Sequence, residues 1–243
     1  RDQIGTKELI QSVTQEQFFE YMKSLYVGEN MVVTVAGAVN KSSLDLIEKY
    51  FTDVSAAKPS RKSFDFENIS TKKWHGRIKK TEQYHLSFGA LAVSENDSQY
   101  PALKILSTVL GGNMSSRMFQ NVREQKGLCY SIRTSIDEYT DTGLIATNAG
   151  VKKEDVLEAL KAIRAEYDDV RENGITQIEF EKAKNYLLGK IDLSTEDSEG
   201  IAHHFAKEML LYKREKLDPI DRIEGLEMRS LYSVQEQQVN ISL

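Results

Sequence analysis

Apolar residues recur along the chain with two periods, and each period predicts a different element. Residues 15–26 and the stretch after Asn40 place apolar side chains every three or four positions, which indicates two amphipathic helices. The run "NMVVTVAG", residues 30–37, is short and apolar and predicts a buried strand between them. Thr14 and Gln17 form a capping box at the start of the first helix. The first part of the chain therefore predicts helix, strand and helix.

Three later runs predict strands. "HLSFGALAV" alternates small or polar with apolar residues, as a half-buried strand does, and "GLCYSIRTSI" and "GLIATNAG" flank the turn "EYTDTG". A long amphipathic helix is predicted over about residues 153–171, and Thr176 with Glu179 forms a capping box that opens another. Strands mixed with pairs of helices indicate the α+β class, with a two-layer mixed or antiparallel sheet packed with helices.

A segment without periodicity separates these two groups of elements. Residues 57–73 contain Pro59 among small and polar residues, which predicts a linker. Residues 1–56 are then one module, and residues 74–243 are a second one. A chain of 243 residues is long enough for two modules, because a typical domain has roughly 100 to 150 residues.

Composition narrows the classes of partner. With 40% hydrophobic and 28% charged residues, the chain has the make-up of a folded globular protein. A net charge of −5 argues against a nucleic-acid partner, because such proteins present a basic surface to phosphates. No stretch approaches the 18 or so apolar residues of a membrane span, so no membrane partner is expected. The composition does not argue against a peptide or a small molecule as the ligand.

Cys129 is the one cysteine of the sequence. A single cysteine excludes a disulfide within the chain and any zinc site built from several cysteines. It fits a reducing compartment, so we expect a cytoplasmic location.

The glycine pair Gly111-Gly112 allows two interpretations. A glycine-rich loop can cradle a phosphate, but neither of the usual phosphate-binding glycine patterns is present. The alternative is a helix end at which glycine adopts the left-handed conformation, followed by Ser115 or Ser116 as the cap of the next helix. We favour the helix end.

A possible metal pair stands among the four histidines, His75, His85, His203 and His204. His204 and Glu208 are four positions apart on a predicted helix, a spacing that can chelate a metal when a third ligand converges. Neither H-x-x-E-H nor H-E-x-x-H occurs in the sequence. A surface interaction between the two side chains is therefore the favoured interpretation, and no metal site is expected in this chain.

Arg123 and Tyr130 are the strongest candidates for a functional site. Arg123 is expected near the end of a short helix, Gly127 in the turn after it, and Tyr130 at the start of the next strand. A guanidinium and a phenol directed at one point can stabilise a peptide carbonyl that gains negative charge in hydrolysis. The alternative is structural: Arg123 complements the helix dipole and Tyr130 packs at the margin of the sheet.

The residues around this corner, "LGGNMSSRMFQNVREQKGLCYSI", closely resemble the C-terminal half of the pitrilysin and insulinase family of zinc metallopeptidases. "GTKELIQSVTQEQFFEYMKSLYVGENMVVTVAGAVN" resembles the end of the preceding, zinc-bearing half, and "TQIEFEKAKNYLLGKIDLSTEDSEGIAHHFAKEML" resembles later helices of the C-terminal half. The resemblance implies a clamshell of two similar α+β halves. It also implies that this chain is a fragment that lacks the last helix and strand of its second half.

In this family zinc is held by an H-x-x-E-H helix and a downstream glutamate, and that motif is absent here. The resemblance therefore implies zinc in the full-length protein or in a partner, and no catalytic residue in this chain. Arg123 and Tyr130 match the residues with which the C-terminal half holds the substrate backbone and polarises the scissile carbonyl. We expect a parent zinc endopeptidase, with this fragment inactive by itself.

The partners that the resemblance implies are a peptide substrate and either the missing N-terminal half or a zinc-bearing partner subunit, in a homodimer or heterodimer. The alternative is a non-catalytic subunit of a two-chain peptidase or assembly of the same family. The residues present are compatible with both.

Overall fold

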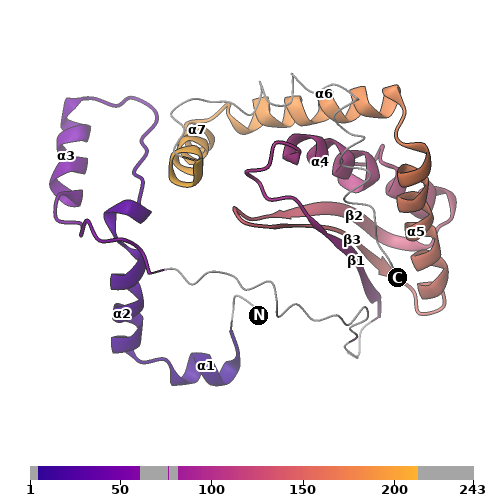
Figure 1. Ribbon diagram of the computed structural model, residues 1–243, viewed down its shortest axis with the longest axis horizontal. Coiled ribbons are helices and arrows are strands. Elements are labelled where there is room, and N and C mark those ends of the chain that lie inside the picture. Colours follow the sequence, from indigo (N-terminus) through magenta and orange to yellow (C-terminus); the bar gives the residue numbers. More distant parts are fainter. Residues whose placement is uncertain (1–4, 61–75, 77–81, 213–243) are drawn as a thin grey trace. The chain divides into compact units, whose positions relative to one another are not determined.

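The computed structural model describes residues 5–60, 76 and 82–212, which belong to two compact units (Figure 1). Residues 5–60 and 195–212 belong to the first unit, and residues 82–194 belong to the second. The sequence had grouped residues 195–212 with the second module. Most of the expected linker lies outside the described residues, so the module boundary stays a prediction.

The first unit consists of short helices whose starts are capped by side chains. Thr14 accepts a hydrogen bond from the backbone of Gln17, and the Gln17 side chain accepts one from the backbone of Thr14, so the predicted capping box is confirmed. Asn40 and Asp197 cap two further helices in the same way. The elements are α1 (Lys7–Ser12), α2 (Gln15–Leu25), η1 (Gly28–Asn30), α3 (Lys41–Phe51), α7 (Ser198–Lys207) and the π-helical η5 (Glu208–Tyr212).

The predicted strand over residues 30–37 is wrong. Met31 has an extended backbone, with φ −127° and ψ 140°, but residues 31–36 join no sheet within the described chain. Val33 and Val35 are 42% and 49% exposed, and the Thr34 hydroxyl donates to the carbonyl of Ala202, 2.8 Å away. The apolar run predicts extended backbone, whereas a strand also needs a neighbour with which to form its hydrogen bonds.

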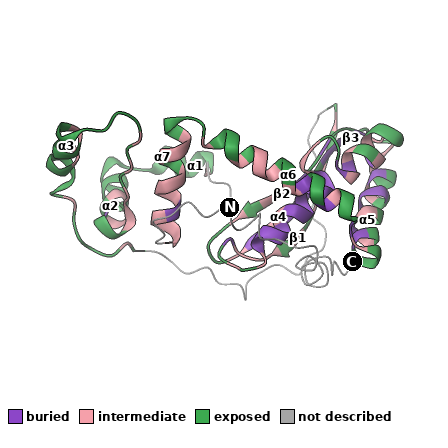
Figure 2. Ribbon diagram, turned by 90° about the horizontal axis from the view of Figure 1, so that it is seen from above, coloured by how far each residue is buried: buried purple, intermediate pink, exposed green. Residues whose placement is uncertain are grey.

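Few side chains of the first unit are buried, as the colours of Figure 2 show for α2 and α3. Val27 is the single buried hydrophobic residue among the described residues of this unit. Phe18 and Phe19 on α2 and Leu44 and Tyr50 on α3 are all exposed. The apolar stripes of these helices are therefore only partly covered within the described residues.

The second unit is built on a three-stranded antiparallel sheet. Its strands are β1 (Tyr84–Ala92), β2 (Cys129–Glu138) and β3 (Gly143–Val151), in the order β1-β3-β2. β2 and β3 form the expected hairpin, so β3 lies between the two edge strands. The α+β class and the antiparallel sheet predicted from the sequence are confirmed.

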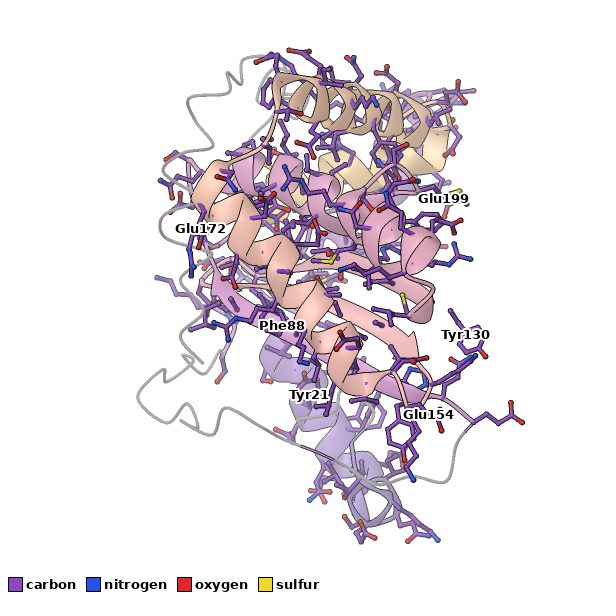
Figure 3. All side chains as sticks on the ribbon, turned by 90° about the vertical axis from the view of Figure 1, so that its right-hand side faces the viewer. Tyr21, Phe88, Tyr130, Glu154, Glu172 and Glu199 are labelled. Atoms are coloured by element: carbon purple, nitrogen blue, oxygen red, sulfur yellow. The ribbon has the colours of Figure 1, made fainter. Side chains whose placement is uncertain are left out.

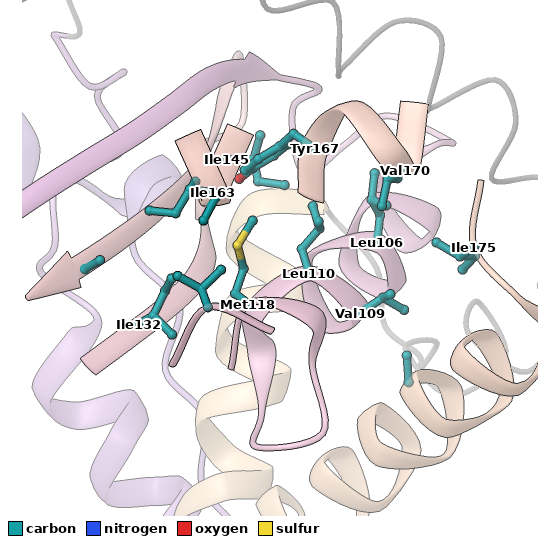
Figure 4. Packing of buried hydrophobic residues seen from close by; sticks show 14 of the residues in the cluster. Leu106, Val109, Leu110, Met118, Ile132, Ile145, Ile163, Tyr167, Val170 and Ile175 are labelled. Carbon is teal, nitrogen blue, oxygen red and sulfur yellow. The ribbon is translucent and has the colours of Figure 1, made fainter. Parts of the chain in front are cut away.

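Helices cover one face of this sheet (Figure 1). α5 contacts β1 and β3, while α4, η3 and η4 contact β2, and α6 packs on α4 and η3. Leucine, isoleucine and valine side chains fill the space between these helices and the sheet (Figure 4). The bounds are α4 (Tyr100–Ser107), η3 (Thr108–Gly112), η4 (Met118–Gln125), α5 (Val156–Asn173) and α6 (Gln177–Ser194), of which η3 and η4 are π-helical.

A chain of hydroxyl groups runs through the core. The Thr134 and Thr147 hydroxyls lie 2.7 Å apart, and the Thr147 and Tyr167 hydroxyls lie 2.8 Å apart. Burial raises the pKa of Tyr167, while its hydrogen bonds to the threonines act in the opposite direction. The phenol therefore stays neutral, and the polar groups are satisfied inside the core.

Candidate functional site

The corner between η4 and β2 has the backbone that the sequence predicts. Met118 and Val122 are fully buried and anchor η4 in the core. Gly127 has a φ of 63°, and its amide donates to the carbonyl of Arg123 over 3.0 Å. This is a left-handed glycine cap, which ends the helix and lets β2 start at Cys129.

Arg123 lies on the last turn of η4 and presents its guanidinium at the surface. The guanidinium carbon is 4.4 Å from the centre of the Phe119 ring, and Nη1 is 3.4 Å from a carboxylate oxygen of Glu124. The side chain is 35% exposed. Stacking on Phe119 restricts the orientation of the charged group while its donor edge remains accessible.

Tyr130 occupies a β-bulge at the start of β2. Cys129 pairs with Val151 and Ser131 with Gly150, so Tyr130 is an extra residue in the ladder. Cys129 and Ile132 are buried, whereas Tyr130 and Ser131 are both exposed. The bulge therefore directs two successive side chains away from the core. Tyr130 projects away from the ribbon (Figure 3) and is 56% exposed.

The structure places Arg123 and Tyr130 at the two ends of one tight corner, yet each has its own neighbour. The Nζ atom of Lys152 lies 5.9 Å from the centre of the Tyr130 ring, whereas Arg123 stacks on Phe119. No hydrogen bond or ring contact joins Arg123 to Tyr130 within the described residues. Their shared role in substrate binding stays a prediction.

Cys129 lies beside this corner but is not a reactive thiol. Burial raises its pKa, and the positive charge of Arg123 lowers it only in part. The thiol is therefore neutral at physiological pH, and it belongs to the core.

A helix ends at Gly112, as the sequence predicts, but the left-handed conformation predicted for the glycine pair is wrong. Gly111 has a φ of −162°, which is ordinary extended backbone. A Cβ atom at Gly111 would lie 2.4 Å from the backbone nitrogen of Thr134, so glycine is required by close approach of η3 to β2. The predicted serine cap is wrong as well, because the Asn113 side chain accepts from the backbone of Ser115 over 2.8 Å.

His204 and Glu208 do not form a surface pair, because Glu208 is buried. They lie on consecutive turns of α7 and η5. Within residues 5–60 and 82–212, no three histidine, cysteine, aspartate or glutamate side chains converge on a point that could hold a metal ion. His75 lies outside the described residues. No helix in the described part of the chain is long and apolar enough to cross a membrane.

Arg117 is a residue that sequence reasoning missed. Its guanidinium binds both carboxylate oxygens of Glu179, over 2.6 and 2.9 Å, and a carboxylate oxygen of Asp169 over 2.5 Å. It also donates to the carbonyl of Gly174. Arg117 immediately precedes η4, so these hydrogen bonds connect the helix that carries Arg123 to α5 and α6.

The same hydrogen bonds lower the pKa of Glu179. Burial by itself would raise the pKa of this carboxyl group, but hydrogen bonds from Arg117 and from Thr176 outweigh burial and lower the pKa from 4.5 to about 2. Thr176 and Glu179 form the capping box expected from the sequence, with the Thr176 amide 2.7 Å from Glu179. The three-residue spacing of Thr176 and Glu179 predicts the capping box. Arg117 is 62 positions from Glu179, so no local sequence pattern indicates this contact.

Known proteins similar to this chain agree with the resemblance drawn from the corner. Residues 12–187 match the family model described as the peptidase M16 inactive domain. A Bacillus subtilis protein named "Uncharacterized zinc protease YmxG" is 32% identical over 218 residues, which cover 89% of this chain and 53% of that protein. A Helicobacter pylori protein named "Non-peptidase homolog YmxG" is 27% identical over 201 residues, 79% of this chain and 45% of that protein.

Solved structures show the same fold. The peptidase M16 inactive domain from Pseudomonas fluorescens superposes with a TM-score of 0.81 at 19% sequence identity, over 99% of this chain and 58% of that one. The chain spans about half the length of the curated relatives it matches. By the family match over residues 12–187, the chain belongs to the peptidase M16 family and corresponds to the inactive domain of that family.

Proposed function

We propose that this chain is the substrate-binding half of a zinc-dependent endopeptidase that hydrolyses peptides. The observation that carries the proposal is the η4–β2 corner. A left-handed glycine and a β-bulge there leave the guanidinium of Arg123 and the phenol of Tyr130 exposed at one corner of the sheet. The family match and the relatives named zinc proteases support the same proposal.

Arg123 and Tyr130 supply hydrogen-bond donors in this proposal. The guanidinium donates to the backbone carbonyls of an extended peptide and fixes its position. The phenol donates to the scissile carbonyl, whose oxygen gains negative charge as the peptide bond is attacked. Stacking on Phe119 restricts the Arg123 guanidinium, and the bulge directs Tyr130 away from the core, so both donors face a substrate on this surface.

The donor atoms in the described part of this chain do not fit a zinc ion. Catalytic zinc takes three protein ligands, and no such group of side chains converges in residues 5–60 or 82–212. The proposal therefore assigns the zinc ligands to a preceding half of the same polypeptide or to a zinc-bearing partner subunit, in a homodimer or heterodimer. The 243-residue chain by itself is expected to have no peptidase activity.

A non-catalytic subunit of a two-chain peptidase or assembly is the second candidate function. The name of the Helicobacter pylori relative, a non-peptidase homolog, favours it. In that case Arg123 and Tyr130 serve a zinc site carried by another chain, or serve assembly alone. The parent coding sequence upstream of Arg1 separates the two candidates: H-x-x-E-H with a downstream glutamate supports the peptidase, and replaced ligands support the subunit.

The experiment that tests the leading proposal uses Arg123→Ala and Tyr130→Phe in the full-length parent protein. We expect Tyr130→Phe to lower kcat/KM for a fluorogenic peptide by about 100-fold or more, since removing one donor to a developing oxyanion has a cost of that order. Arg123→Ala should lower kcat/KM by about 100-fold, because a misplaced substrate has a cost of that order. Zinc content, measured by atomic emission, should not change.

Two matched variants control for surface substitutions of the same chemistry. Arg164→Ala removes a similarly exposed arginine on α5, and Tyr139→Phe removes a phenol that is 51% exposed beyond β2. Both should keep the wild-type rate. Wild-type rates in the Arg123 and Tyr130 variants would contradict the proposal.

A further inference from the structure

The face of the sheet opposite the helices carries a row of polar side chains that have no partner among the described residues. His85 and Ser87 come from β1, Asn148 from β3, and Ser131 and Arg133 from β2, and all five are exposed. The register places Ser87, Asn148 and Arg133 side by side across the three strands. Together they line a cavity of about 300 Å³ whose floor includes Gly150.

This cavity differs from a second one in the same unit. In the second cavity, beside η4 and α5, Arg117 donates to Glu179 and Asn121 donates to Glu166. In the sheet cavity, none of the five polar side chains makes a hydrogen bond to any part of the described chain. Their hydrogen-bonding capacity is therefore free for a ligand.

Arg133 is the one described arginine without a carboxylate partner. The other four, Arg117, Arg123, Arg164 and Arg171, each have a carboxylate oxygen within 3.4 Å. A guanidinium fork without a partner, beside an amide and two hydroxyls, matches the geometry and charge of a carboxylate. The sheet cavity is thus complementary to an acidic group.

The sheet cavity adjoins the proposed peptide site. The bulge directs Tyr130 and Ser131 to the same side of β2, and Ser131 lines the cavity. Arg133 is three residues beyond Tyr130, roughly 7 to 10 Å along the strand at about 3.3 Å per residue, because the bulged residue adds less than a full rise. An extended peptide with its scissile carbonyl at Tyr130 would carry a side chain two or three residues away to Arg133.

We propose that this cavity is a subsite that binds an acidic side chain, aspartate or glutamate, of the peptide substrate through Arg133. Asn148 and Ser87 complete the set of donors around the carboxylate. The inference rests on the proposed function, because it specifies which peptides that site accepts.

The test measures peptide binding by the full-length parent protein, stripped of zinc with a chelator so that no probe is cleaved. The probes are fluorescent peptides, acetylated and amidated at their ends, which carry one glutamate at successive positions or glutamine in its place. Fluorescence anisotropy at fixed ionic strength reports affinity. We expect one position at which glutamate binds about tenfold more tightly than glutamine.

Arg133→Gln should remove this preference while affinity for the glutamine peptide is retained, and Arg133→Glu should favour a lysine at the same position. Arg164→Gln, on the helix that covers the other face of the sheet, is the matched control and should keep the preference. Equal binding of both wild-type probes, or a preference that survives Arg133→Gln, overturns the subsite and leaves the proposed function standing. If no peptide binds at all, the proposed function and the subsite both fail.

Discussion

The two units start helices with the same capping residues but differ in how far those helices are packed into a core. α2 in the first unit and α6 in the second both begin with a threonine capping box. α6 then places Phe180 and Ala183 in a closed core, whereas α2 buries no residue. Short isolated helices are marginal in water, so a cap defines where a helix starts and packing decides how stable it is.

The largest expected difference is in hydrogen exchange. Amides of β3, at the centre of the sheet and beside buried Ile145 and Val151, should open only with global unfolding of the second unit. Amides of α2 and α3 should exchange through local opening. We expect at least about a thousandfold greater protection in β3, measured by mass spectrometry on the 243-residue chain. Comparable protection of α2 would show that the first unit has a stable core of its own.

Two leucine substitutions sharpen the comparison. Leu106→Ala on α4 removes a fully buried side chain and should lower the free energy of unfolding by about 2 to 5 kcal/mol. Leu44→Ala on α3 is the matched change at an exposed helical position and should alter it by no more than about 0.5 kcal/mol. Urea denaturation followed by circular dichroism measures both. A similar loss in the two variants would contradict the contrast between the units.

A smaller loss of folding stability is expected at low pH. Because the folded pKa of Glu179 is lowered to about 2, its stabilising contribution is present above pH 4.5 and is lost as the pH falls from 4.5 to about 2. A shift of this size corresponds to at most about 3 kcal/mol. Glu179→Gln should flatten the fall in stability over that pH window, whereas Glu181→Gln on the same helix should retain it. Thermal melts between pH 2 and pH 7 provide the measurement, and identical profiles for wild type and Glu179→Gln would refute the assignment.

Sequence reasoning succeeded where a signal lies within a few residues. The capping boxes at Thr14 and Thr176, the left-handed glycine at Gly127 and the β2–β3 hairpin each depend on neighbours in the chain. It failed where the cause is distant. The glycine at 111 is required by the strand at Thr134, and the run at 30–37 has no pairing strand among the described residues.

The candidate site also combines features that a continuous stretch of sequence predicts with features that depend on strand pairing. Arg123 and Tyr130 were identified because the resemblance covers one continuous stretch of sequence. The bulge that directs Tyr130 outward depends on pairing with Val151 and Gly150, which no local pattern reveals. Arg133 and Asn148 belong to separate strands, and only the register of the sheet brings them to one cavity.

The bulge at Tyr130 also bears on how such a site can be gained or lost during evolution. Side chains of a strand alternate between faces, so an insertion normally turns every following residue to the wrong face. Here the extra residue is absorbed locally, and the burial pattern from Ile132 onward is that of a regular strand. Deletion of Tyr130 alone would restore the plain alternation of Cys129, Ser131 and Ile132. A relative can therefore discard the phenol in one genetic step while it keeps the same core.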